Sequence, residues 1–422
     1  MGTTEKGFKR KAGLLLIFLC WLVYACSYIG KVNYAANINQ IMSFYAVDHS
    51  SAGLVSTLFF FAYGIGQVVN GLLCKKYNIK WFVFGSLIVS GTVNFIVGVT
   101  TNFTLIKFLW LLNGFSMSVL WPCLIRLLSE TLNKNDMAKA SVIMGTTVAT
   151  GTLFVYALSA LFVRINFKIL FYLPAGLFFV AAVAWSLSYS PLVRQAKNES
   201  EVEQTQEQEV DENTKEAHKN GLLLTIIMLA FYGVATNLIK DGLTTWVPSI
   251  LKEEYQLDNS ISIILTLALP IVAIFANAFA VRMHNKIKDF ILQCATMFLI
   301  AGIIIGCVIG GMSLNLFWIT LLGFTLVCFL VSSCNSVITS IFPLFMRGKV
   351  NSGRIAGLLN GFCYLGSTIS SYGLGTIADC FGWLAVFWVL LGVCVLVCLG
   401  AIIYLMITRV AHGKKNLGSK SI

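Results

Sequence analysis

Long apolar segments separated by short polar stretches repeat along the whole chain. The first covers residues 13–38, and Lys31 is the only charged side chain in it. A helix over such a segment would extend about 39 Å at 1.5 Å per residue, which exceeds the roughly 30 Å hydrocarbon layer of a bilayer. The pattern therefore predicts a membrane-spanning helix with one lysine near its far end.

Eleven further apolar segments follow, in two groups around a polar gap. They cover residues 51–73, 79–100, 104–127, 139–162, 168–188, 221–249, 259–282, 288–310, 315–341, 352–376 and 382–408. The gap at 191–220 is rich in glutamate and glutamine and has little to bury, which indicates a solvated linker. The predicted fold is an all-α membrane protein of twelve transmembrane helices. Its domains are two six-helix bundles, residues 1–190 and 221–422, joined by this acidic linker.

Composition agrees with this class and excludes a soluble one. Hydrophobic residues make up 57% of the chain and charged residues 11%, whereas soluble domains carry about 25% charged residues. The net charge of +12 does not indicate nucleic-acid binding, because 24 of the 30 basic residues fall in alternate loops and the termini. That alternation predicts a multi-pass plasma-membrane protein with both termini and the linker in the cytoplasm.

The twelve cysteines lie almost entirely in apolar segments and form no CxxC pair. Cysteines in such positions behave as small hydrophobic side chains. We therefore expect no disulfide framework, no metal site and no cofactor.

The two halves resemble each other in sequence. CKKYNIKWF at 74–82 matches RMHNKIKDF at 282–290, and WPCLIR at 121–126 matches FPLFMR at 342–347. Each matching pair occupies the same place in its half, which indicates a duplication. Duplicated halves place a transporter's substrate site near the middle of the membrane, where the halves meet.

This symmetry relates Lys31 to Lys240, which lies at a similar depth in the seventh segment. A lysine within a span costs about 3 kcal/mol unless it faces water or a partner. Two ammonium groups about 10 Å apart would repel each other by roughly 1.7 kcal/mol at an effective dielectric constant near 20. An anion bound by both would relieve that repulsion. The alternative is that each lysine extends to the membrane interface or forms a structural pair.

Asp241 follows Lys240 directly and is the only acid well inside a predicted span. Adjacent helical positions do not face each other, so we expect Asp241 not to neutralise Lys240. It is a candidate coupling carboxylate, or it pairs with a neighbouring span. The four histidines, at 49, 218, 284 and 412, are predicted in loops or tails. Only Asp241 is then available for proton coupling, which favours exchange of one anion for another.

Several polar side chains near the two lysines are candidate substrate-binding residues, although each also fits interhelical hydrogen bonding. They are Tyr28, Asn33 and Thr147 in the first half, and Asn237, Asn360 and Tyr364 in the second.

The twelve-span plan, with GLLCKKYNIK after the second span, resembles the major facilitator superfamily. Within it, the chain resembles the organophosphate:phosphate antiporters, the family of glycerol-3-phosphate and hexose-phosphate transporters. The segments that carry this resemblance are YIGKVNY, LWPCLIR, LFYLPAG, NLIKDGLTTWVPSIL, GLLNGFCYLGS and ADCFGW. The chain departs from the superfamily pattern at Cys74, where the loop after the second span has an aspartate.

The resemblance implies a binding site as well as a fold. Two arginines bind phosphate in that family, and they fall on Lys31 and Lys240. This departure keeps the charges but loses the planar fork that suits a phosphate. A histidine of the glycerol-phosphate branch falls near Thr147, so its role does not carry over.

The resulting hypothesis is a secondary transporter of a small organic anion, working by alternating access. It would exchange a phosphorylated metabolite for inorganic phosphate, with Lys31 and Lys240 holding the anionic group. The alternative is a proton-coupled symporter of a carboxylated solute such as a sugar acid. We expect a monomer in the lipid bilayer, with no catalytic residues and no nucleic-acid partner.

Overall fold

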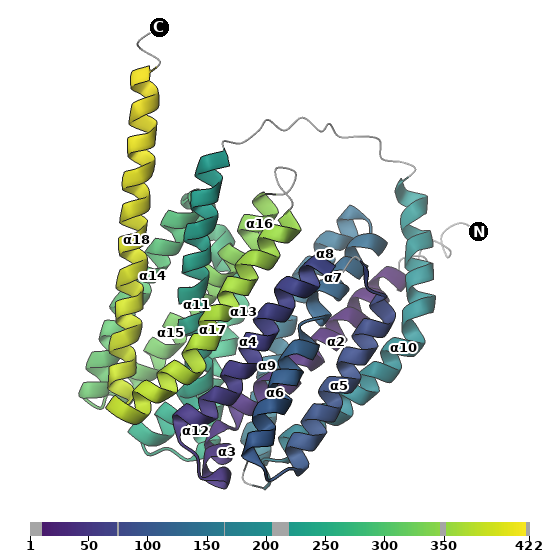
Figure 1. Cartoon of the computed structure of the whole chain (residues 1–422), viewed down its shortest axis with the longest axis horizontal. Helices are drawn as coiled ribbons and strands as arrows, with labels where there is room; N and C mark the ends of the chain where they lie inside the picture. Colours follow the sequence, from purple (N-terminus) through teal and green to yellow (C-terminus); the bar gives the residue numbers. More distant parts are fainter. Residues whose placement is uncertain (1–10, 74–75, 164, 205–218, 347–351, 419–422) are drawn as a thin grey trace. The chain divides into compact units, whose positions relative to one another are not determined.

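All regular secondary structure in the described part of the chain is helical (Figure 1). The structure is a computed structural model that describes residues 11–73, 76–163, 165–204, 219–346 and 352–418. Eleven helical stretches are long and apolar enough to cross a membrane. The one predicted span that is not among these eleven is the segment 352–376, which forms α17 (Ser352–Phe381), a 30-residue helix that is less apolar because it is rich in serine and glycine. The predicted all-α class is confirmed.

Contacts within the chain divide it into two compact units. The first comprises Met1–Val47, Leu54–Asn213 and Asp258–Pro270, and the second comprises Asp48–Gly53, Thr214–Leu257 and Ile271–Ile422. Each unit thus takes a short segment from the other half of the sequence. The predicted domain boundaries, which lie only at the central linker, stay a prediction.

The helices up to the central linker are, in chain order, α2 (Lys11–Ala36), α3 (Ile38–Tyr45), α4 (His49–Leu73), α5 (Ile79–Val99), α6 (Phe103–Met117), α7 (Leu120–Thr131), α8 (Lys134–Gly145), α9 (Thr147–Phe162) and α10 (Ile169–Gln204). Those after it are α11 (Lys219–Glu254), α12 (Asn259–Thr266), α13 (Ala268–Lys286), α14 (Phe290–Ser313), α15 (Phe317–Ser336), the π-helix η2 (Val337–Ile341), α16 (Phe342–Phe345), α17 and α18 (Trp383–Gly418).

Several predicted spans are interrupted rather than continuous. The first ends as α2 at Ala36, and α3 continues after a turn at Asn37. The fourth breaks at Ser118, whose hydroxyl donates to the Phe115 carbonyl at 2.6 Å, and the fifth breaks at Thr146, whose hydroxyl donates to the Ile143 carbonyl at 2.8 Å. Such hydroxyls compete with the backbone for hydrogen bonds, which weakens a helix locally.

Helix α10 extends further than the sequence predicted. It continues to Gln204 and so includes the first part of the predicted linker. Glutamate, glutamine and lysine favour helix, which explains the extension. Residues 205–218 of the linker, with His218, lie outside the described residues, as does Cys74, and the last two linker residues begin α11.

The first unit is packed around α2. This helix lies against α9 and α10, and α10 also packs along α5. A cluster of buried apolar residues, which includes Ile29, Val155 and Tyr156, is completed by Ile263 of α12. That contact is the reason why a segment from the second half of the sequence belongs to the first unit.

The second unit contains a very close helix pair, α11 and α17 (Figure 1). A Cβ atom added at Gly366 of α17 would overlap the Val234 carbonyl of α11. A Cβ added at Gly233 of α11 would lie 3.0 Å from the Cys363 sulfur. Small residues that allow two backbones to approach are typical of helix interfaces in membranes.

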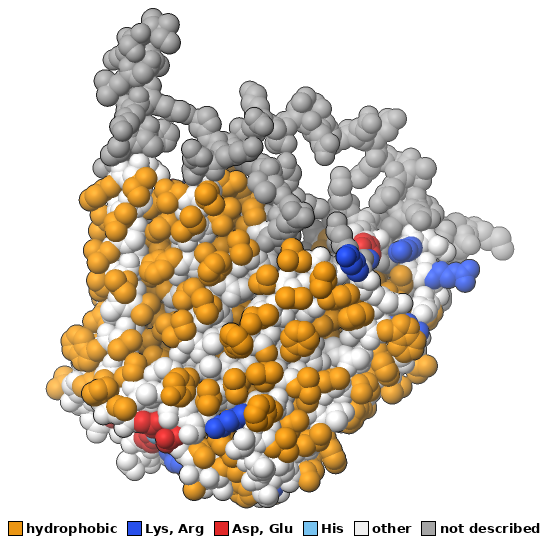
Figure 2. Space-filling view, in the orientation of Figure 1, with side chains coloured by type: hydrophobic (Ala, Val, Ile, Leu, Met, Phe, Trp, Pro, Cys, Tyr) orange, Lys and Arg blue, Asp and Glu red, His pale blue; other side chains and the backbone are white. Residues whose placement is uncertain are grey.

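Hydrophobic side chains cover most of the described surface in the view of Figure 2, and few charged side chains are visible there. Exposed large apolar residues occur on many helices, for example Phe18 on α2, Trp318 on α15 and Ile303 on α14. Soluble proteins avoid apolar surfaces of this extent. The surface is that of a protein that contacts lipid.

Replacing Gly366 with alanine should destabilise the second unit, because the added methyl group would force α11 and α17 apart. We expect a loss of about 1–3 kcal/mol, the usual cost of overpacking. The measurement is thermal unfolding of the purified protein in detergent. Gly357→Ala on the same helix is the matched control, since a Cβ at Gly357 meets no atom within 4 Å. Equal melting temperatures for both variants would contradict this account of the packing.

Candidate functional site

The Lys31 side chain of α2 lies among aromatic rings of the first unit. Its Nζ is 4.5 Å from the ring centroid of Tyr63, 4.9 Å from that of Tyr28, 5.4 Å from that of Phe60 and 5.7 Å from that of Phe59. A cation over an aromatic face is stabilised by about 0.5–2 kcal/mol, depending on how well water is excluded. These rings are neutral, so they stabilise the ammonium group without cancelling its charge.

The aromatic surface continues beyond these rings. The Tyr24 ring packs edge-on against Tyr28 at 5.5 Å between ring centroids and in a tilted arrangement against Trp121 at 4.7 Å. Its hydroxyl is 3.4 Å from that of Tyr63. Lys31 and Tyr28 are half-buried, whereas Tyr24 and Tyr63 are buried. The first unit therefore presents a partly accessible cation on an aromatic wall that carries hydroxyl groups.

Lys240 of α11 is paired differently. Its Nζ lies 3.4 Å from Asp241 Oδ1, with side chains 26% and 16% exposed. This contact corrects the expectation that Asp241 does not neutralise Lys240. Adjacent side chains diverge at their Cβ atoms, but the four-carbon lysine stem is long enough to curve back to its neighbour. Because the pair is partly exposed, the charge on Lys240 is reduced but accessible.

A hydrogen-bond network orients Asp241. Its Oδ2 accepts from the hydroxyl of Ser367 on α17 and from the amide of Asn237 at 3.4 Å. Asn237 also donates to Ser367 Oγ at 3.1 Å and accepts from Asn335 of α15 at 2.7 Å. The π-helix η2 begins directly after α15, and such bulges are frequent at functional sites. Three helices thus hold the carboxylate beside Lys240.

The other predicted site residues lie in two kinds of surroundings. Asn33 is fully buried, and its amide donates to Asn94 Oδ1 at 2.8 Å and to the Leu170 carbonyl at 2.9 Å. Thr147 is also fully buried, at the start of α9, where its hydroxyl donates to the Met144 carbonyl. These two side chains form hydrogen bonds with neighbouring residues of the helices and are not exposed to solvent.

Asn360 and Tyr364 both lie on α17, the helix that packs along α11. Asn360 is half-buried and Tyr364 is 8% exposed. They precede Ser367 by seven and three positions, which places them along the same side of the helix as that serine. In the second unit the structure therefore brings together Lys240, Asp241 and Asn237, with these two residues on the adjacent helix.

The sequence placed the histidines in loops or tails, but three of them lie in helices. His49 is the first residue of α4, His284 lies within α13 and His412 lies within α18. Both His49 ring nitrogens contact carboxylate oxygens, those of Glu253 at 2.8 Å and Asp379 at 2.6 Å. The carboxylates follow His49 by 204 and 330 positions, so only the fold brings them together. Among the described residues, no group of three His, Cys, Asp or Glu side chains is arranged to hold a metal ion.

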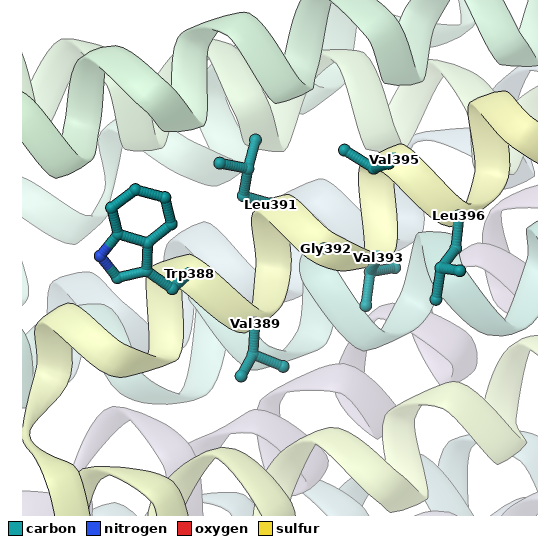
Figure 3. A pocket seen from close by; sticks show the side chains of 7 residues that line it. All are labelled: Trp388, Val389, Leu391, Gly392, Val393, Val395 and Leu396. Carbon is teal, nitrogen blue, oxygen red and sulfur yellow. The ribbon is translucent and has the colours of Figure 1, made fainter.

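A hollow on the second unit has no role in binding an anion. It lies along α18 and is lined by apolar side chains, among them Trp388, Leu391 and Val395 (Figure 3). The seven lining residues all come from this one helix and none is charged. An apolar groove on a lipid-contacting helix fits an acyl chain of the bilayer better than a phosphate.

The sequence pattern of the Major Facilitator Superfamily matches residues 20–352. The chain belongs to the Major Facilitator Superfamily. This superfamily consists of multi-pass membrane transporters, and the predicted fold of twelve transmembrane helices in two six-helix bundles is confirmed.

Two curated relatives of this superfamily member are named for sugar-phosphate exchange or hexose-phosphate transport. It is 20% identical to "Sugar phosphate exchanger 3" of Homo sapiens, covering 85% of this chain and 82% of the relative. It is 20% identical to "Probable hexose phosphate transport protein" of Chlamydia pneumoniae, covering 96% and 93%. Identity to "Membrane sensor protein UhpC" of Escherichia coli is 28%, over 29% of this chain and only 28% of that protein. The resemblance to organophosphate:phosphate antiporters is confirmed.

A solved structure supports the fold of this superfamily member. It is that of a bacterial homolog to the human lysosomal transporter Spinster, in an inward-facing and occupied conformation. The TM-score is 0.68 at 12% identity, covering 94% of this chain and 96% of the other. At this identity the comparison concerns the fold alone.

Replacing Lys31 with glutamine should abolish anion binding, because the aromatic rings around it are neutral and the ammonium group supplies the positive charge that attracts an anion. Lys107→Gln is the matched control, since Lys107 also lies over an aromatic ring, that of Phe103 at 5.2 Å. Binding of inorganic phosphate is measured by the thermal shift of the purified protein. We expect no shift for Lys31→Gln and an unchanged shift for the control. An equal shift in both would remove Lys31 from the site.

Proposed function

We propose that this chain is a secondary transporter that exchanges a phosphorylated small metabolite for inorganic phosphate by alternating access. The observation that carries the proposal is that each unit presents one partly accessible lysine from within a span, Lys31 on α2 and Lys240 on α11. The relatives named as a sugar phosphate exchanger and a hexose phosphate transport protein support the same substrate class.

The surroundings of the two lysines suit different parts of such a substrate. An ammonium group forms charge-assisted hydrogen bonds with a phosphate oxygen, and aromatic rings such as Tyr28 pack against the apolar face of a sugar. Lysine binds phosphate as a point charge, without the bidentate geometry of arginine. The site therefore selects for negative charge more than for the shape of one particular head group.

In this proposal Asp241 competes with the substrate for Lys240. An arriving anion displaces the carboxylate, which stays hydrogen-bonded to Ser367 and Asn237. Tyr364 and Asn360 of α17 contribute further polar contacts, and Asn33 and Thr147 maintain the helix packing around Lys31. In this proposal the protein is a transporter and not an enzyme, and the exchange requires no cofactor, metal or catalytic step.

We further propose that the protein acts as a monomer in the plasma membrane, with both termini in the cytoplasm. The distribution of basic residues supports this orientation. In this orientation, helix α4 (His49–Leu73) begins at the extracellular face.

Proteoliposomes test the exchange directly. Uptake of a radiolabelled hexose phosphate should require phosphate inside the vesicle and should be unaffected by a proton gradient, because the counter-substrate is the phosphate anion. Uptake driven by a proton gradient into phosphate-free vesicles would instead support the alternative, symport of a carboxylated solute. Binding without any uptake would indicate a sensor, the role named for the partial relative UhpC.

The Asp241→Asn variant separates the two transport modes. If Asp241 only competes for Lys240, removing its charge should increase phosphate affinity several-fold and leave phosphate-dependent exchange intact. Affinity is measured by isothermal titration, and exchange by the proteoliposome assay. If Asp241 carries a coupled proton, the same variant loses gradient-driven uptake. Ser367→Ala is the control, since it keeps the carboxylate but removes one of its hydrogen bonds.

A further inference from the structure

We propose that His49, Glu253 and Asp379 form a proton-binding site that holds the first turn of α4 against α11 and α17. All three residues belong to the second unit. His49 Nδ1 lies 2.6 Å from Asp379 Oδ1, and Nε2 lies 2.8 Å from Glu253 Oε1. We refer to these three side chains as the histidine clasp.

The geometry of the histidine clasp requires a proton. A neutral imidazole has one N–H and one lone pair, so it can donate to only one of two carboxylates. The protonated ring donates to both, and the three groups then carry a net charge of −1. When the proton leaves to solvent the net charge becomes −2, and one ring nitrogen faces a carboxylate oxygen with lone pairs on both atoms.

Each carboxylate also accepts hydrogen bonds from other groups, which fix its position. The protonated His49 ring connects the two carboxylates. Asp379 Oδ1 accepts from the His49 backbone N–H at 3.2 Å, and its Oδ2 accepts from the Ser50 N–H at 2.7 Å. Asp379 thus caps α4 from another helix. Glu253 Oε2 accepts from Trp383 Nε1 at 2.8 Å. The side chains of His49, Glu253 and Asp379 are 17%, 36% and 22% exposed, so solvent protons can reach the site.

The packing around the clasp is too close to tolerate a displaced first turn. A Cβ at Gly53 would overlap the Ser371 carbonyl, and a Cβ at Gly375 would lie 2.8 Å from the His49 carbonyl. The rings of Trp246 and Trp383 lie 5.5 and 5.1 Å from the His49 ring. The first turn of α4 is therefore seated against α17 and covered by two tryptophans.

The other charged groups near the clasp do not replace its proton. On α11, Glu253 is flanked by Lys252 and Glu254, and before α4 stands Asp48. Hydrogen bonds from the Ser51 side chain and backbone hold the pKa of Asp48 below its usual range, so Asp48 stays ionised as a cap of α4. From α18 the neutral Trp383 donates a hydrogen bond to Glu253. In the described residues, His49 is the group of this cluster that changes charge near neutral pH.

The consequence for transport rests on the proposed function. Helix α4 leaves the second unit after Gly53, and its residues from Leu54 on belong to the first unit. Alternating access at the face where α4 begins would require the first turn of α4 to separate from α11 and α17. Protonated His49 opposes that separation. Acid at this face should therefore slow transport, and loss of the proton should speed it.

Exchange in proteoliposomes with equal pH on both sides tests this coupling at two values, about one unit below and about two units above 6.5, the ordinary pKa of histidine, because two neighbouring carboxylates favour the protonated ring. Wild-type exchange should be about tenfold slower at the lower pH, the factor that one charge-assisted hydrogen bond supplies. His49→Gln should be fast at both values and His49→Arg slow at both, since arginine keeps its charge. His284→Gln is the matched control, because His284 contacts Gln293 and Phe290 instead.

Phosphate also titrates in this range, so each variant is compared with wild type at the same pH. A wild-type rate that does not depend on pH would overturn the proposal, as would a pH profile that survives in His49→Gln. If His49→Gln fails to insert, His49→Arg is the deciding variant. Slow exchange at both pH values supports the proposal, and a pH profile like that of the wild type overturns it.

A second measurement does not depend on transport. Protonated imidazole quenches tryptophan fluorescence, so the emission of detergent-purified wild type should fall with acidification as His49 gains its proton beside Trp246 and Trp383. His49→Gln should lack this step and His284→Gln should keep it. A step of equal size in His49→Gln would overturn the proton site. If exchange is absent in every variant while the step is present, the proposed function fails and the proton site stands.

Discussion

The energetic cost of a charge in a low-dielectric environment governs the interior of this protein. A lysine in the middle of an apolar helix is tolerated only if its surroundings stabilise the ammonium group. The two units meet that requirement by different chemistry. The first surrounds Lys31 with aromatic rings, four of which lie within 5.7 Å of Nζ, and the second pairs Lys240 with the carboxylate of Asp241.

These two solutions leave different amounts of charge for a ligand. Aromatic rings attract a cation through their quadrupoles and do not cancel its net charge. A carboxylate at 3.4 Å cancels much of the field of Lys240 until it is displaced. The asymmetry arises from one residue, since no acid follows Lys31 as Asp241 follows Lys240. The two halves thus differ at positions that their sequence similarity aligns.

The same cost explains the histidine clasp. Two partly buried carboxylates that approach one imidazole would repel each other unless a proton lies between them. Close packing through Gly53 and Gly375 fixes the distance at which this repulsion acts. The close contacts at Gly53 and Gly375 keep the carboxylates near the imidazole. A change in the protonation of His49 therefore changes the repulsion that acts on the first turn of α4.

The sequence alone determined the class, the number of spans and the family, because apolar runs, loop charges and local motifs are properties of neighbouring residues. It also singled out the two lysines as candidate site residues. It did not determine the partners of those lysines. The contact from Lys240 to Asp241 depends on the side-chain conformation of lysine and on Ser367, which lies 126 positions away. The clasp at His49 depends on residues 204 and 330 positions further along. Such separations carry no periodic signal, so only the tertiary structure decided which charges meet.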